Sequence, residues 1–197
     1  MAKVDELRKL RNKLGFSYKT CEKLYGVPTG IWKGLELGNV KNKDYRLNLL
    51  IEKMEKDYSI VKLVKACADL LGVNCPKIDF DYEAKKVGNL AGLDNGILKV
   101  VHDYDNIYDI YFAICHEMRH LYQLTYNQEI FENYTELSDS IDTEKYNLQA
   151  AEIDANAFAT IFIEQNIGVR PLFLGYSDKV KEKIFERVDE LKGSIER

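Results

Sequence analysis

The sequence predicts a mostly helical α+β protein, in which a small helical unit precedes a larger domain with a small sheet. Three observations support this fold class. Short amphipathic segments that end at glycines fill residues 1–56. Apolar and polar residues alternate between residues 74 and 105, as they do in half-buried strands. Segments with apolar residues at helical spacing dominate the rest of the chain. We therefore predict one domain over residues 1–56 and a second over residues 57–197.

The composition is that of a globular protein with enough apolar material for a core, because 46% of the 197 residues are hydrophobic and 30% are charged. No run approaches the ~18 apolar residues of a membrane-spanning helix, and the first residues carry no apolar signal segment. We therefore expect a cytoplasmic protein with no membrane partner. The four cysteines are scattered without a C-x-x-C pair, which favours reduced thiols over disulfides.

Charge is divided unevenly between the two predicted domains. Residues 1–56 hold 13 Lys and Arg against 7 Asp and Glu, whereas the rest of the chain holds 15 against 25. A basic first domain and an acidic second one indicate separate modules. The basic charge makes a polyanion such as DNA a candidate partner of the first.

Short helices separated by tight turns are expected in the first domain. The first predicted helix ends at Gly15, the second is capped by Ser17 and ends at Gly26, and the third runs from Pro28 to Gly38. Two further amphipathic helices should follow, over residues 46–56 and 59–71.

A small sheet is predicted next. Residues 78–82 alternate like a half-buried strand, and residues 88–93 and 97–101 should form a hairpin. The Asn95-Gly96 pair between them is the typical sequence of a two-residue hairpin turn, because both residues tolerate positive φ.

The segment His116-Glu117-Met118-Arg119-His120 is an H-E-x-x-H sequence inside a predicted helix over residues 107–123. Four residues advance a helix by about 400°, so the two histidines project from nearly one face and can bind one metal ion. Zinc suits imidazole and carboxylate ligands, and Glu117 is the candidate general base for hydrolysis. A motif this short also arises by chance, but two of only three histidines in the chain fall in it. This concentration favours a metal site.

A third ligand is available in a second predicted helix over residues 148–165. By chemistry alone, either Glu152 or Asp154 could serve. The two carboxylates stand about 200° apart around the helix, so they cannot point in the same direction.

Two other segments complete the second domain. Residues 128–147 carry six acidic residues and one lysine, which predicts a solvated, partly helical linker between the two helices that carry ligands. The alternative is a lid or charged rim beside a cleft. Residues 177–195 predict a charged amphipathic helix with an N-cap at Ser177.

Together with His116-Glu117-Met118-Arg119-His120, the segment Glu152-Ile153-Asp154-Ala155-Asn156-Ala157-Phe158-Ala159 resembles the ImmA/IrrE-type metallopeptidases. Their pattern pairs H-E-x-x-H with E-x-x-A-[ND]-x-F-A, and the resemblance covers roughly residues 60–165. It implies a zincin-like domain, with Zn²⁺ held by His116, His120 and Glu152. Asn156 lies one turn after Glu152 and could orient a ligand histidine.

The glycine-punctuated helices of residues 4–55 carry a second resemblance. Leu10-Arg11 stands before Gly15-Phe16-Ser17, and Leu24-Tyr25-Gly26-Val27 and Leu35-Glu36-Leu37-Gly38 follow at the spacing of the Xre/Cro-type helix-turn-helix family. The resemblance implies a helix-turn-helix module.

Departures from that family pattern affect DNA recognition. Glu22 stands where the family has a small alanine, and Tyr18 where it often has a glutamine that contacts phosphate. Of the outward positions on the third helix, only Lys33 has a long side chain, whereas reading base edges takes several such residues. The module could therefore bind DNA weakly or dock a protein.

These features together predict a zinc-dependent endopeptidase in which Glu117 accepts a proton from water and passes it to the leaving amine. The resemblance implies a limited cut in a protein partner, an Xre-type transcriptional repressor of stress or mobile-element genes. The alternative is a DNA-binding regulator whose peptidase-like domain holds metal or partners without cleaving. The residue that stabilises the oxyanion stays open among His102, Tyr122, Tyr126 and Tyr134.

Overall fold

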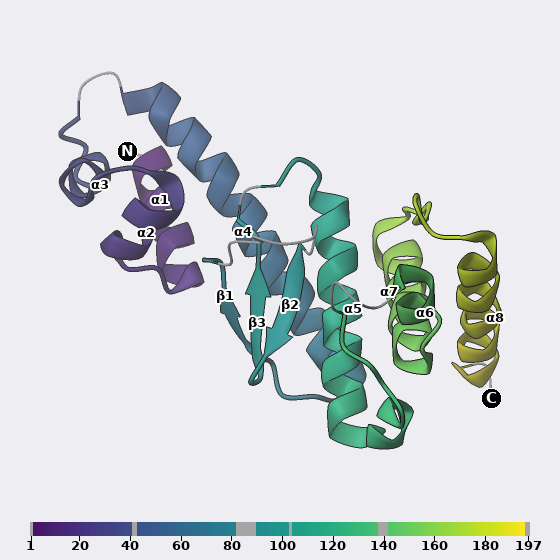
Figure 1. The fold of residues 1–197 in the computed structure, drawn as a ribbon. Helices are drawn as coiled ribbons and strands as arrows, with labels where there is room; N and C mark the ends of the chain where they lie inside the picture. The colour runs from purple at the N-terminus through teal and green to yellow at the C-terminus, as the bar shows by residue number, and fades with distance from the viewer. Residues whose placement is uncertain (1, 41–42, 82–89, 103, 138–141, 196–197) are drawn as a thin grey trace. The chain divides into compact units, whose positions relative to one another are not determined.

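The computed structural model describes residues 2–40, 43–81, 90–102, 104–137 and 142–195. The chain divides into two compact units, Met1–Lys65 and Ala66–Arg197. As predicted, the protein is mostly helical with one small sheet (Figure 1). The division falls inside the long helix α4 (Lys43–Leu71), as does the boundary that the sequence predicts after residue 56.

The first unit begins with three short helices, α1 (Ala2–Leu14), α2 (Tyr18–Tyr25) and α3 (Thr29–Glu36). Their ends follow the sequence signals. The Ser17 side chain accepts a hydrogen bond from the Thr20 N–H, and Gly26 adopts a left-handed conformation at the end of α2. The three helices and the first part of α4 bury an apolar core of Leu7, Cys21, Trp32, Leu35, Leu47 and Met54.

A buried carboxylate ties the helices of the first unit together. The Glu36 side chain is 3% exposed and accepts hydrogen bonds from Arg11 Nε at 2.7 Å, Trp32 Nε1 at 3.0 Å and the Tyr18 hydroxyl at 3.0 Å. Burial alone would raise the pKa of Glu36, but the bonds from Arg11, Trp32 and Tyr18 outweigh it and lower the pKa. Tyr18 is therefore held inside the unit by Glu36, which is a role that the sequence does not indicate.

Helix α4 is continuous, and the prediction of two helices over residues 46–56 and 59–71 is wrong. The Ser59 hydroxyl donates to the Lys56 carbonyl at 2.6 Å, so it bonds back within the helix rather than capping a new one. Asp57 is buried and accepts a hydrogen bond from the Tyr25 hydroxyl. The polar side chains at the predicted boundary are therefore satisfied within an unbroken helix.

The second unit contains a three-stranded sheet in the order β1-β3-β2, formed by β1 (Lys77–Asp79), β2 (Ala91–Asp94) and β3 (Ile97–Val100). Strands β2 and β3 form the predicted hairpin, with Asn95 and Gly96 both at positive φ. Strand β1 pairs with β3 in parallel. The predicted strands at 78–82 and 88–93 extend into residues 82–89, which lie outside the described part of the chain. Strand β2 is an edge strand and packs against α5 (Ile107–Tyr126) (Figure 1).

Helices fill the rest of the second unit. Helix α7 (Ala150–Ile167) packs against α5 and against α8 (Asp178–Ile195), while α6 (Thr143–Asn147) and a 3₁₀ turn (Gln128–Phe131) connect α5 to α7 (Figure 1). Helix α7 is buried around most of its circumference, which its apolar sequence explains. No helix in the part of the chain that the structure describes is long and apolar enough to span a membrane.

Candidate metal centre

Helices α5 and α7 bring three candidate ligands together. His116, His120 and Glu152 each offer one ligand atom, and these atoms all lie within 4.8 Å of one another. His116 Nε2 lies 3.2 Å from one carboxylate oxygen of Glu152, Oε2, and His120 Nε2 lies 3.3 Å from the other, Oε1. The two Nε2 atoms are 2.9 Å apart. The group could hold a metal ion.

Local sequence explains this arrangement. Helix α5 begins at Asn106, whose side chain accepts a hydrogen bond from the Tyr108 N–H. Ile110, Ile114 and Met118 are fully buried and fix the rotation of α5 about its axis. The two histidines of the motif, at half-buried positions, consequently face Glu152 in the first turn of α7.

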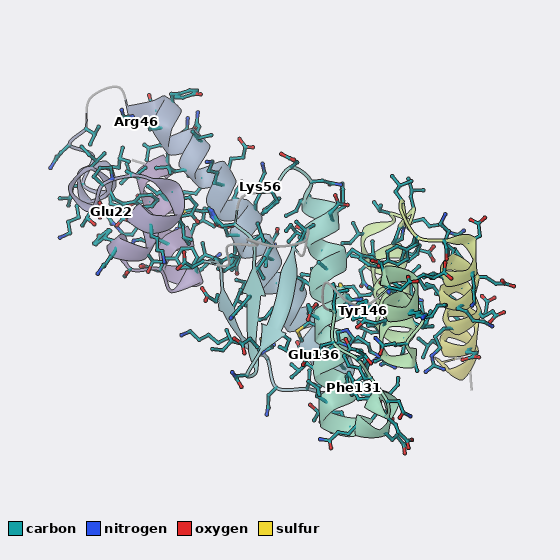
Figure 2. The ribbon with its side chains drawn as sticks, in the orientation of Figure 1. Glu22, Arg46, Lys56, Phe131, Glu136 and Tyr146 are labelled. Carbon is teal, nitrogen blue, oxygen red and sulfur yellow. The ribbon has the colours of Figure 1, made fainter. Side chains whose placement is uncertain are left out.

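Two tyrosine hydroxyls hold the Glu152 carboxylate. Tyr134 and Tyr146, the latter labelled in Figure 2, donate to Glu152 Oε1 at 2.7 and 2.8 Å. Glu152 is 2% exposed, and although burial would raise its pKa, hydrogen bonds and charge from His116 and His120 hold the pKa well below its usual range. Because Oε1 already accepts two hydrogen bonds, Oε2 is the oxygen left for a metal ion.

Each histidine is also bonded at the ring nitrogen that faces away from the centre. His116 Nδ1 lies 3.2 Å from Asn156 Oδ1, and His120 Nδ1 lies 2.8 Å from Gln123 Oε1. Asn156 therefore reaches a candidate ligand, as its spacing from Glu152 predicts. Gln123 is fully buried and was not anticipated from the sequence.

Glu117 follows His116 in α5, and it lines one cavity together with His116 and Glu152. Burial raises the pKa of its carboxyl group, while His116, His120 and the backbone N–H of Leu93 on strand β2 oppose the rise. A carboxyl group with an elevated pKa is suited to accept and return a proton near neutral pH.

Asp154, the rival carboxylate, points elsewhere. Its two oxygens accept hydrogen bonds from Arg119 Nε at 2.7 Å and from Arg187 Nε at 2.9 Å. Asp154 therefore pairs with arginines on α5 and α8, and it is not one of the three candidate ligands. Glu152 and Asp154 stand about 200° apart around α7, which is why they reach different partners.

A cavity of about 840 Å³ opens beside the centre. Strand β2 and α5 form one wall, and residues 169–176, between α7 and α8, form another. Leu137, Thr143, Tyr146 and Asn147 also line it, so the acidic segment over residues 128–147 borders the cavity rather than only linking helices. Asp139, one of its acidic residues, lies outside the described part of the chain.

None of the four oxyanion candidates chosen from the sequence, all of them described residues, lines this cavity. Tyr122 stacks on the Arg119 guanidinium at 4.4 Å, and the Tyr126 hydroxyl donates to the Gly72 carbonyl. The Tyr134 hydroxyl is bonded to Glu152. Tyr176, in contrast, lines the cavity, and no pattern in the sequence singles it out.

The fold and the site thus define a mostly helical protein with a His-His-Glu group that could hold a metal ion. No family model matches the chain, and neither a curated protein nor a solved structure does.

Proposed function

We propose that this chain is a zinc-dependent endopeptidase of the ImmA/IrrE type that makes a limited cut in a protein partner. Zinc with four tetrahedral ligands at about 2.0–2.1 Å sets neighbouring ligand atoms about 3.3 Å apart. The two Nε2 atoms are 2.9 Å apart and His116 Nε2 lies 3.2 Å from Glu152 Oε2, so the donor set and these spacings fit this ion. Three protein ligands leave a fourth position for water or substrate, as catalytic zinc sites do.

Bound zinc would supply Lewis acidity, which lowers the pKa of water to about 7 and polarises a peptide carbonyl. Glu117 lies in the cavity beside the three ligands and accepts the proton of the attacking water. It then returns that proton to the leaving amine, so that one carboxyl group serves both halves of the reaction. The Leu93 N–H holds the Glu117 side chain in place.

The sheet edge beside the cavity suits an extended peptide. Leu90 accepts a hydrogen bond from the Val101 N–H across the hairpin, so by the alternation of antiparallel pairs Ala91 and Leu93 turn their backbone groups away from β3. The outward N–H of Leu93 is bonded to Glu117, and Ala91 lines the cavity. A substrate strand added beside Ala91 would run along the cavity that His116, Glu117 and Glu152 also line.

Restricted access favours a limited cut. Both the segment that carries Tyr146 and residues 169–176 border the cavity, so a substrate must fit between them. Leu172 and Leu174 on that border are 75% and 85% exposed, which suits docking of an apolar surface. By resemblance to the ImmA/IrrE type, the partner is an Xre-type helix-turn-helix repressor cut in an exposed loop.

The convergence of the His116, His120 and Glu152 ligand atoms beside Glu117 is the observation that carries this proposal. The test is to incubate the zinc-loaded protein with casein and, separately, with helix-turn-helix repressors encoded near its own gene. We expect a single cut in one repressor, almost no digestion of casein, and no cut by Glu117→Gln, which retains zinc and partner.

Two results would contradict the proposal. Extensive digestion of casein would show that the enzyme is not limited to a single cut. A repressor cut equally well by Glu117→Gln would refute the role of Glu117 as the proton acceptor. A repressor that Glu117→Gln and the unmodified protein both bind, and that neither cuts, would instead favour a regulator whose peptidase-like domain binds without cleaving.

A further inference from the structure

Gln123 is locked in one orientation on the side of His120 that faces away from the candidate metal ligands. It is fully buried, and its amide nitrogen donates to the Ala151 carbonyl at 3.1 Å and to Asp154 Oδ2 at 2.8 Å. Both partners are acceptors, so rotating the amide would place its oxygen against two other oxygens. Gln123 must therefore keep its nitrogen toward α7 and its oxygen toward His120.

Asp154 makes this orientation compulsory because it can only accept. Arg119 donates to its two oxygens at 2.7 and 3.2 Å, and Arg187, from α8, donates to Oδ1 at 2.9 and 2.8 Å. Two guanidinium groups keep the carboxylate ionised although Asp154 is only 1% exposed. An ionised carboxylate has no proton to give, so it faces only the amide nitrogen of Gln123.

The consequence reaches the metal centre through one hydrogen bond. Gln123 Oε1 lies 2.8 Å from His120 Nδ1, and an amide oxygen only accepts, so Nδ1 must carry the hydrogen. In neutral imidazole the other nitrogen, Nε2, then presents a lone pair. We propose that Gln123 is a positioning residue that sets the metal-binding tautomer of His120, and that Asp154, held by Arg119 and Arg187, sets Gln123.

His116 offers an internal comparison. Its Nδ1 lies 3.2 Å from Asn156 Oδ1, but the buried Asn156 amide nitrogen makes no hydrogen bond of normal geometry among the described residues. The Asn156 side chain interacts with the hydroxyl of Tyr176, which can donate or accept. The environment of Asn156 therefore does not fix its orientation as Asp154 fixes that of Gln123. This contrast makes His120 the histidine that is preset for a metal ion.

Nitrogen NMR of the metal-free protein tests the tautomer directly. The chain has only three histidines, so ¹⁵N-histidine labelling gives few signals, and a single substitution assigns each. At about pH 9, well above the ordinary histidine pKa of about 6.5, neutral rings are observed. We expect His120 to carry its hydrogen on Nδ1, and Gln123→Met to shift it toward the Nε2–H form.

Zinc affinity, measured by competition with a chromophoric chelator, gives a second readout. Gln123→Met should bind zinc about 10–100-fold more weakly, because the supporting hydrogen bond is lost while all three ligands remain. Gln128→Met is the matched control, since Gln128 is exposed and, among the described residues, its side chain bonds only to the Leu124 carbonyl near the end of α5. Asp154→Asn frees the Gln123 amide to rotate and should shift the His120 tautomer in the same direction.

The inference rests on the metal centre of the proposed function but not on peptide cleavage. An Nε2–H tautomer of His120 in the unmodified protein would overturn it, and this measurement needs no variant that could misfold. Equal zinc affinity of Gln123→Met and Gln128→Met would also overturn it. A protein that shows the expected tautomer but binds no zinc would refute the proposed function and leave the role of Gln123 intact.

Discussion

Replacing Tyr146 with Phe isolates one of the two hydrogen bonds that hold Glu152. The Tyr146 hydroxyl donates to Glu152 Oε1 at 2.8 Å, and the carboxylate is 2% exposed, so water cannot easily replace the lost donor. Hydrogen bonds to charged groups contribute about 1.5–3 kcal/mol. We expect Tyr146→Phe to lower the free energy of unfolding of the metal-free protein by that amount. Zinc should reduce the loss, because the ion also neutralises the carboxylate.

Urea unfolding followed by far-ultraviolet circular dichroism measures this change, and Tyr122→Phe is the matched control. The Tyr122 ring stacks on Arg119, but its hydroxyl makes no hydrogen bond among the residues described, so the control should change stability by less than about 0.5 kcal/mol. Equal stability of Tyr146→Phe and Tyr122→Phe would refute the assigned role of Tyr146.

Three further predictions follow from other parts of the chain. DNA binding by the first unit should be weak and salt-sensitive in a mobility-shift titration, and tight binding to one operator at moderate salt would contradict this. Because folding lowers the Glu36 pKa, the ionised carboxylate stabilises the first unit fully above about pH 4.5, and this stabilisation is lost as the pH falls. In thermal melts, lowering the pH should therefore destabilise Glu36→Gln less than the unmodified protein. Mass spectrometry after thiol labelling should find Cys75 modified and the buried Cys67 and Cys115 untouched.

Local signals in the sequence predicted much of the fold. The Ser17 cap, the left-handed Gly26 and the Asn95-Gly96 turn depend on residues close in sequence, and each appears where expected. The start of α5 is likewise a local feature, since the Asn106 side chain caps the helix by accepting a hydrogen bond from the Tyr108 N–H. The helix spacing of the H-E-x-x-H motif places both histidines on one face for the same reason.

Features that depend on packing between distant elements could not be predicted in this way. Tyr146 and Gln123 reach the centre only because α6 and α5 dock against α7, and neither lies in a motif. Arg187 pairs with Asp154 across 33 positions of sequence. The continuity of α4 also differs from the prediction, and the Ser59 hydroxyl at the predicted boundary bonds back to the Lys56 carbonyl within the helix. In each of these cases, sequence spacing does not reveal the hydrogen-bond partner of the side chain.

Zinc content of three purified proteins tests the central claim most directly. We predict about one zinc per chain in the unmodified protein, measured by elemental analysis after saturation with zinc and removal of the unbound ion. Glu152→Ala should lose the metal, because it removes a ligand. Asp154→Ala should still bind one zinc at saturation, with weaker affinity, because it removes the acceptor of Gln123, Arg119 and Arg187 but no metal ligand. An Asp154→Ala protein without zinc beside a zinc-loaded Glu152→Ala protein would contradict the assigned metal centre.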